Sequence, residues 1–171
     1  TTTEGAQPVK VDATEYFDNI IHPVLAQRGD KLPVSAFIGH EDGAVPVGTT
    51  KYERRGIAVQ VPVWEADSCA QCNRCSLVCP HACIRPFLVT DEALAAAPEG
   101  FTAKKATGKE FAGYNFRIQI DPYDCTGCGN CIQVCPTVQK GTLKMADFAE
   151  IGDAEDKNWA YALSLPKFDM T

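Results

Sequence analysis

Eight of the nine cysteines in this chain fall into two copies of one spacing. The copies are Cys69-x2-Cys72-x2-Cys75-x3-Cys79-Pro80 and Cys125-x2-Cys128-x2-Cys131-x3-Cys135-Pro136. The first three thiolates of such a loop can bind three iron corners of a cubane, while the fourth points away and reaches a second cluster. The spacing therefore predicts two 4Fe-4S clusters, and with them one-electron transfer.

Each cluster should draw ligands from both copies of the motif, because the fourth cysteine of each copy serves the other cluster. We expect cluster 1 to be held by Cys69, Cys72, Cys75 and Cys135. We expect cluster 2 to be held by Cys125, Cys128, Cys131 and Cys79. Replacing any one of these ligands should damage a whole cluster.

Structural zinc is the alternative metal, because paired Cys-x2-Cys units also form tetrahedral thiolate sites. A zinc site, however, gives no role to the third and fourth cysteines of each copy. The proline directly after the last cysteine, present in both copies, is typical of iron-sulfur proteins. The spacing therefore favours clusters over zinc.

The chain opens at Thr1 without a charged and then apolar leader, and its sequence holds no apolar run long enough to span a bilayer. We therefore expect a cytoplasmic setting with no membrane partner, where thiols stay reduced and disulfides are rare. The formal net charge of -6 argues against nucleic acid as a partner, since nucleic-acid binding usually needs a basic face.

Three regions differ in composition. Residues 1–50 contain no cysteine and predict a linker or arm with one amphipathic helix, from Ala13 to about Arg28, that begins near Asp12 and is disturbed by Pro23. A short strand should follow at residues 34–38. Residues 51–150 contain the cysteine repeat, and residues 151–171 should form an acidic link or tail towards a following domain, with Glu150 to Asp156 as a solvated helix face or link.

An internal repeat surrounds the two motifs. Alternating apolar residues at 57–63 and 114–120 predict a strand before each motif, and apolar runs at 84–89 and 142–148 predict a strand after it, with a short helix following each Cys-Pro pair. The expected fold class is α+β, a bacterial-type 2(4Fe-4S) ferredoxin-like pseudo-symmetric fold with an N-terminal helical and loop arm. Between the halves, residues 91–97 should be helical and residues 98–113 should form a surface loop.

Residues outside the cysteines carry a family resemblance. The segments are Pro33-Val-Ser-Ala-Phe37, Glu41-Asp-Gly43, Pro46-Val-Gly-Thr49, Tyr52-Glu-Arg-Arg-Gly-Ile-Ala58, Val61-Pro-Val-Trp64 and Cys79-Pro-His-Ala-Cys-Ile-Arg-Pro86. Together they resemble pyruvate:ferredoxin oxidoreductase over nearly the whole chain. The resemblance implies an internal electron-transfer domain of an enzyme that converts pyruvate and coenzyme A to acetyl-CoA and carbon dioxide.

The same resemblance places other parts of that enzyme outside this chain. It implies that thiamine diphosphate, Mg2+ and a third 4Fe-4S cluster lie elsewhere in a longer, homodimeric polypeptide whose external partner is ferredoxin or flavodoxin. The sequence contains no thiamine motif, GxGxxG or P-loop, so we predict no catalytic residue and no organic cofactor site here. The alternative is a ferredoxin or ferredoxin-like subunit of another redox complex, such as a hydrogenase or another 2-oxoacid oxidoreductase.

Several residues near the motifs admit two interpretations. Cys83, the ninth cysteine, is expected to be a buried thiol rather than a ligand. His81 is expected to be a surface residue, although it could donate a hydrogen bond to sulfur. Trp64 and Tyr123 are expected to be packing residues. Backbone N-H groups of both cysteine loops should donate to sulfur, and glycines at 127 and 129 should let the second loop lie closer to its cluster.

Overall fold

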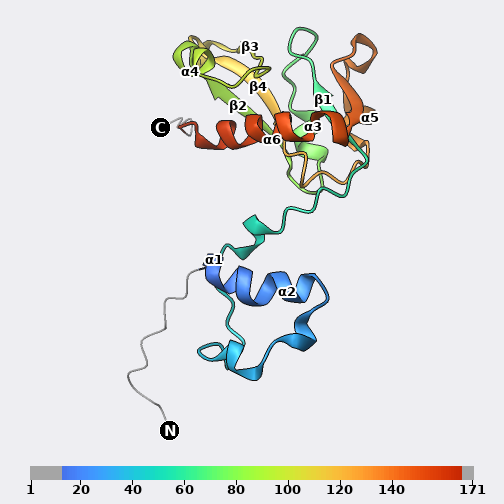
Figure 1. The fold of residues 1–171 in the computed structure, drawn as a ribbon. Coiled ribbons are helices and arrows are strands. Elements are labelled where there is room, and N and C mark those ends of the chain that lie inside the picture. The colour runs from blue at the N-terminus through green and yellow to red at the C-terminus, as the bar shows by residue number, and fades with distance from the viewer. Residues whose placement is uncertain (1–12, 167–171) are drawn as a thin grey trace. The chain divides into compact units, whose positions relative to one another are not determined.

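The structure is a computed structural model, and it describes residues 13–166 (Figure 1). The chain divides into two compact units between Arg54 and Arg55. The expected helix start at Asp12 lies outside the described residues. Each unit is described by itself below.

The N-terminal unit is built on one continuous helical segment. It consists of α1 (Ala13–Tyr16), a π-helical turn (Phe17–Ile21) and α2 (His22–Leu25). The predicted helix is therefore present, and the disturbance expected from Pro23 takes the form of the wide turn before it. Proline has no N-H to donate to the preceding turn, and the N-H of His22 bonds the carbonyl of Phe17 instead.

The strand predicted at residues 34–38 is wrong, because Val34–Phe37 forms a 3-10 helix. A strand needs a partner for its backbone groups, and the described part of this unit contains no strand. Short 3-10 turns at Gly29–Lys31 and Thr49–Tyr52 complete the unit. Its buried contacts are few: Tyr16 packs edge-on against His40, and Phe17 contacts Tyr52.

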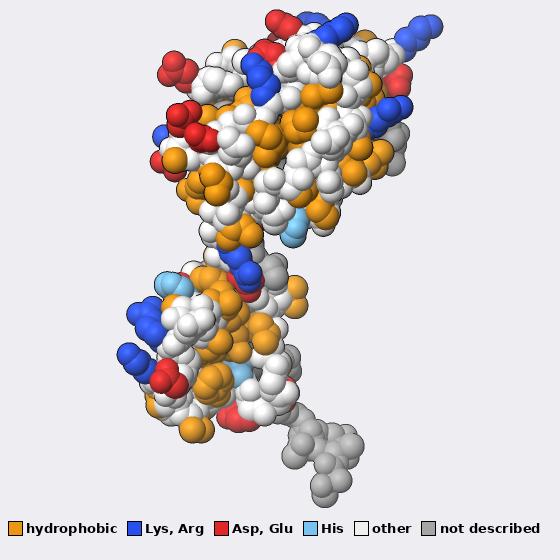
Figure 2. Space-filling model, turned by 90° about the vertical axis from the view of Figure 1, so that its right-hand side faces the viewer, with side chains coloured by type: hydrophobic (Ala, Val, Ile, Leu, Met, Phe, Trp, Pro, Cys, Tyr) orange, Lys and Arg blue, Asp and Glu red, His pale blue; other side chains and the backbone are white. Residues whose placement is uncertain are grey.

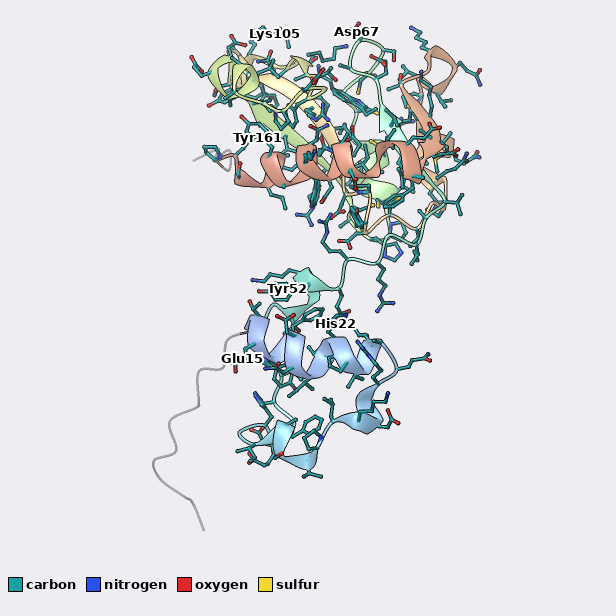
Figure 3. All side chains as sticks on the ribbon, viewed as in Figure 1. Glu15, His22, Tyr52, Asp67, Lys105 and Tyr161 are labelled. Atoms are coloured by element: carbon teal, nitrogen blue, oxygen red, sulfur yellow. The ribbon has the colours of Figure 1, made fainter. Side chains whose placement is uncertain are left out.

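Apolar side chains make up much of the visible surface of this N-terminal unit (Figure 2). Val34, Ile38 and Val47 are 89%, 73% and 97% exposed. Figure 3 shows Tyr52 beside the helical segment that carries Glu15 and His22. The Tyr52 hydroxyl lies 2.7 Å from the hydroxyl of Thr14, so the end of this unit is fastened back to its beginning.

The second unit contains two antiparallel sheets, and each sheet takes strands from both halves of the repeat. β1 (Gln60–Trp64) pairs with β5 (Leu143–Asp147), and Trp64 lies opposite Leu143. β2 (Ile84–Val89) pairs with β4 (Asn115–Ile120), and Ile84 lies opposite Ile120. A two-residue strand, β3 (Lys104–Lys105), adds to the other edge of β4.

The predicted strands on either side of the motifs are thus confirmed, with one shortened. The first strand begins at Gln60, so Ile57 and Val59 precede it and are exposed. The inward residues Val61, Ile118 and Ile120 are almost fully buried in a core that also contains the cysteines. Burial of each such side chain stabilises the fold by about 1.5–3 kcal/mol.

The two short helices expected after the Cys-Pro pairs lie before them. α3 (Arg74–Val78) and α5 (Asn130–Val134) sit inside the cysteine motifs and pack on each other. A residue that precedes proline avoids the helical region, and Cys79 and Cys135 both have an extended ψ of 114°. After Pro80 a turn leads into β2, and after Pro136 a 3-10 turn (Val138–Lys140) follows.

The described part of the segment expected as an acidic link or tail is a helix of the second unit. α6 (Phe148–Ser164) runs along this unit and ends beside α4 (Asp91–Ala95) (Figure 1). Trp159 and Ala162 are buried, and the Tyr161 hydroxyl donates a 2.6 Å bond to the carbonyl of Ala93. Glu150 and Asp153 are exposed on one face of the helix, while the face with Trp159 and Ala162 packs against the unit.

Among the helices of the described residues, none combines the length and the apolar character needed to cross a membrane.

Candidate iron-sulfur site

The first cavity gathers thiols from both motifs. It is lined by Cys69, Cys72 and Cys75 of the first motif and by Cys135 of the second. Its apolar walls come from strands of both sheets. The wall residues are Trp64, Ile118 and Leu143. These four thiols are the set predicted for cluster 1.

The second cavity repeats this arrangement with the motifs exchanged. It is lined by Cys125, Cys128 and Cys131 of the second motif and by Cys79 of the first. Its apolar walls include Pro62, Ile84 and Met145, and Cys83 lies in the same wall. The four motif thiols are the set predicted for cluster 2. The fourth cysteine of each motif lies in the other motif's cavity because each sheet pairs one strand from each half of the repeat.

Both cysteine loops use the same unusual backbone conformation. Gln71 and Asn73 in the first loop have φ of 53° and 57°, and Gly127 and Gly129 at the equivalent places have 69° and 75°. The backbone N-H of Gln71 donates to the Cys69 sulfur at 3.3 Å, and that of Gly127 donates to the Cys125 sulfur at 3.4 Å. Such bonds favour the charged form of the sulfur, which is the form that binds iron.

The two loops hold this conformation by different means. In the first loop, the Gln71 side chain donates to the carbonyl of Lys105 and accepts from the N-H of Thr107, both at 2.8 Å. The Lys104 ammonium group also donates to the carbonyls of Asp67 and Cys69. Figure 3 shows Asp67 and Lys105 at the same end of the second unit. The segment expected to be a plain surface loop therefore braces the first cysteine loop.

In the second loop, glycine is needed at position 127 for a reason other than the one expected. A side-chain carbon added at Gly127 would lie 2.9 Å from the carbonyl oxygen of Gln60 on β1. A carbon added at Gly129 would meet nothing within 4 Å. Close approach of β1, together with the positive φ, accounts for Gly127.

Burial favours the protonated form of two ligand thiols, those of Cys75 and Cys131. It raises the pKa of the Cys75 thiol to about 11 and that of the Cys131 thiol to about 12, because a desolvated thiolate is disfavoured. Cys72 and Cys128, by contrast, are exposed. Binding of iron must displace the protons, so cluster assembly is coupled to proton release. Four converging thiols, apolar walls and N-H donors to sulfur fit a 4Fe-4S cluster in each cavity.

In the part of the chain that the structure describes, no three His, Cys, Asp or Glu side chains come together around a single metal ion. The eight motif thiols are distributed around the two cavities.

Two further groups lie behind the cysteines, of which sequence analysis singled out only Cys83. The Cys83 sulfur lies 3.3 Å from the Cys79 sulfur, and the Thr137 hydroxyl lies 3.6 Å from the Cys135 sulfur. Hydrogen bonding with Cys125, burial and hydrogen bonding with Cys79 raise the pKa of Cys83 well above its usual range, so this thiol stays protonated. The bond from Cys83 lowers the pKa of Cys125 to about 7. The expectation that Cys83 is buried is confirmed.

Arg117 is a buried charge that the sequence did not single out. Its side chain lies over the rings of Phe101 and Trp64, at 4.0 and 5.9 Å, and donates to the Thr102 carbonyl at 2.6 Å. Glu155 on α6 lies 3.8 Å away as its counter-ion. Burial lowers the pKa of Arg117 to about 10, so the group keeps its charge at neutral pH. A charge inside an alternating strand was the signal that could have identified it.

The remaining candidates are less central. His81 is exposed and lines the second cavity from its outer side. Tyr123 packs edge-on against Phe148, as expected of a packing residue. Trp64 packs against Phe116 but also lines the first cavity.

Two family models match the sequence. One, described as a domain of unknown function and named EKR, covers residues 2–58. The other, described as a 4Fe-4S dicluster domain, covers residues 61–136 and 117–155. The division between the two matches lies close to the division between the two units.

Several characterised proteins are similar to the chain. It is 53% identical to the pyruvate:ferredoxin oxidoreductase of Moorella thermoacetica, with 96% of this chain and 14% of that enzyme aligned. It is 49% identical to the pyruvate-flavodoxin oxidoreductase of Enterobacter agglomerans, over 92% of this chain and 13% of the relative. It is 44% identical to the NADP(+) pyruvate dehydrogenase of Cryptosporidium parvum, over 94% and 8%. The chain thus spans about a seventh or less of these relatives.

Proposed function

Since this chain belongs to the 4Fe-4S dicluster domain family and matches a segment of the pyruvate:ferredoxin and pyruvate-flavodoxin oxidoreductases, we propose that it is an electron relay with crossed ligand sets. Cys69, Cys72, Cys75 and Cys135 would hold one cluster, and Cys125, Cys128, Cys131 and Cys79 the other. The observation that carries the proposal is that three thiols of one motif and the fourth thiol of the other line each cavity.

The clusters, when bound, would supply the one-electron oxidation and reduction. The protein's own residues hold them at a fixed separation, exclude water and set how well negative charge is tolerated at each site. Apolar walls such as Ile118 and Leu143 perform the second task, and N-H donors such as those of Gln71 and Gly127 perform the third.

The substrate of the parent enzyme is inferred from the relatives. All three are named as pyruvate enzymes, so we propose that pyruvate and coenzyme A are converted to acetyl-CoA and carbon dioxide in a longer polypeptide. Thiamine diphosphate, Mg2+ and a third 4Fe-4S cluster would lie elsewhere in a homodimer. The two electrons released would pass one at a time through this segment, in a cytoplasmic setting where its thiols stay reduced.

The external acceptor is not set by this segment. Relatives that share it are named for ferredoxin, for flavodoxin and for NADP(+). A segment common to all three is therefore best suited to a relay upstream of the acceptor. We propose ferredoxin or flavodoxin here, because the relatives of highest identity given above are named for them.

A ferredoxin or ferredoxin-like subunit of another redox complex, such as a hydrogenase, is the alternative. The N-terminal unit argues against it. Val34, Ile38 and Val47 expose apolar surface that a freely diffusing carrier has no reason to keep, and the similarity to the pyruvate enzymes extends through this unit.

Metal analysis of the anaerobically purified protein tests the relay. We expect about eight iron and eight acid-labile sulfide attributable to this segment, and a spin-coupled EPR signal after reduction with dithionite. About two zinc per segment, without sulfide or EPR signal, would instead establish a structural zinc module.

A further inference from the structure

The second cavity contains a fifth thiol for which a four-iron cluster has no place. A cubane presents four iron corners, and each takes one thiolate. Cys79, Cys125, Cys128 and Cys131 already supply four thiols to this cavity. Cys83 lines the same cavity, is 4% exposed, and places its sulfur 3.3 Å from that of Cys79.

The position of Cys83 is fixed by the backbone. Its carbonyl accepts a 2.7 Å bond from the N-H of Asp121, and the next residue, Ile84, begins β2. The side chain is therefore held at the cavity wall. A thiol is a weak donor as well as a weak acceptor, and a ligand thiolate beside it has only acceptor capacity. Towards a ligand thiolate, the 3.3 Å contact has one direction, from the Cys83 S-H to the Cys79 sulfur. Cys125, with which Cys83 also hydrogen-bonds, lines the same cavity, so either acceptor places the donor at the second cluster.

We propose that Cys83 donates a hydrogen bond to the Cys79 sulfur and thereby raises the reduction potential of the second cluster. The proposal rests on the ligand sets given under Proposed function. Reduction adds negative charge to the cluster and its sulfur atoms, and a donor to sulfur stabilises the more negative state. Cys83 is thus a tuning residue that acts through the ligand Cys79, and it is not itself a ligand.

The first cavity offers a matched comparison. Its crossing ligand Cys135 has the Thr137 hydroxyl at 3.6 Å, and Thr137 accepts a 2.8 Å bond from Thr142. The contact of the Thr137 hydroxyl is longer than that of Cys83, and it reaches a sulfur of the first cavity instead of the second. Changing Thr137 should therefore affect the first cluster alone, whereas changing Cys83 should affect the second alone.

The test is an EPR-monitored redox titration of the full-length protein that carries this chain, purified anaerobically. The variants are Cys83→Ala, Cys83→Ser and Thr137→Val, each with iron and sulfide measured first. For Cys83→Ala we expect the equilibrium constant for reduction of one cluster to fall by about tenfold, or about 59 mV for a one-electron couple. Cys83→Ser keeps a donor, so its potential should stay closer to that of the unchanged protein, and Thr137→Val should shift a different signal.

Each other outcome has a definite meaning. Equal shifts in the Ala and Ser variants, or no shift in either with the clusters intact, would overturn the donor role and leave Cys83 as packing. Loss of iron in Cys83→Ala alone would also overturn it, because the residue would then be holding the cluster. Absence of iron and sulfide from the unchanged protein would instead sink the proposed relay itself.

Discussion

The two cavities share a backbone plan but differ in the side chains that support it. The first loop uses Gln71 and Asn73 in a left-handed conformation and braces Gln71 against residues 105 and 107. The second loop uses glycines and needs no such brace, but it carries Cys83 behind its sulfur atoms. The comparison teaches that the motif fixes where the sulfur atoms lie, while residues outside the motif set the electrostatics of each site.

The largest effects should come from breaking the ligand sets in pairs. In the double variant Cys72→Ser with Cys135→Ser, both changes fall in the first cavity, so one cluster and about half of the iron should remain. In Cys72→Ser with Cys79→Ser, the changes fall in different cavities, so both clusters should be lost. Iron and sulfide analysis with EPR distinguishes the two variants, whose numbers of removed thiols are the same.

This pair of variants also tests the crossing itself. If each motif held its own cluster, the second double variant would keep one cluster and the first would lose both. The two ligand patterns therefore predict opposite results, and loss of metal through simple unfolding would give the same result for both variants.

The next largest effect should be on stability near the first cavity, through Arg117. Arg117→Met removes a buried charge, and with it the cation that faces Glu155 and the donor to the Thr102 carbonyl. Removing one member of a buried pair costs about 3 kcal/mol or more. Arg85→Met is the control, since Arg85 is exposed and lies 5.1 Å over the Trp159 ring, a contact worth about 1 kcal/mol or less. Chemical denaturation under anaerobic conditions measures both, and equal losses would contradict the buried-pair argument.

Gly127 and Gly129 provide the third and smaller contrast, in the second loop. Both have positive φ, so alanine at either position should cost about 1 kcal/mol from the backbone alone. At Gly127 the added carbon also meets the Gln60 carbonyl at 2.9 Å, which should raise the cost to about 2 kcal/mol or more. Denaturation midpoints of Gly127→Ala and Gly129→Ala measure the difference. Equal midpoints would show that β1 moves away without cost.

Sequence reasoning located the site because its information is local. The spacing of the cysteines names the cluster type, and crossed ligation then gives the two sets that line the two cavities. The apolar run at 84–89 and the alternation at 114–120 also predicted strands, and the two strands pair with each other in the structure. The run at 34–38 is as apolar, but it has no partner strand among the described residues and turns into a 3-10 helix.

What the sequence did not give depends on contacts between distant residues. Arg117 contacts Glu155 and Thr102, and the positions of these residues in the sequence do not predict the contact. The short helices inside the motifs were misplaced because each is only five residues long, which is too short to show a helical periodicity. The full length of α6 was not predicted, because the acidic residues at its start suggested a solvated segment, whereas Trp159 and Ala162 further along it are buried.

The smallest effect we predict concerns Trp64, which the sequence suggested was only a packing residue. Its indole N-H is buried and has no hydrogen-bond partner among the described residues, although the side chain lines the first cavity. An unpaired buried donor is costly, and the sulfur atoms of a bound cluster are the acceptors that the cavity would supply. Trp64→Phe keeps the apolar wall and removes the donor. We expect the potential of the first cluster to fall by about 40 mV, the equivalent of about 1 kcal/mol for one electron, while the second cluster keeps its own. A redox titration in which both potentials stay unchanged would return Trp64 to a packing role.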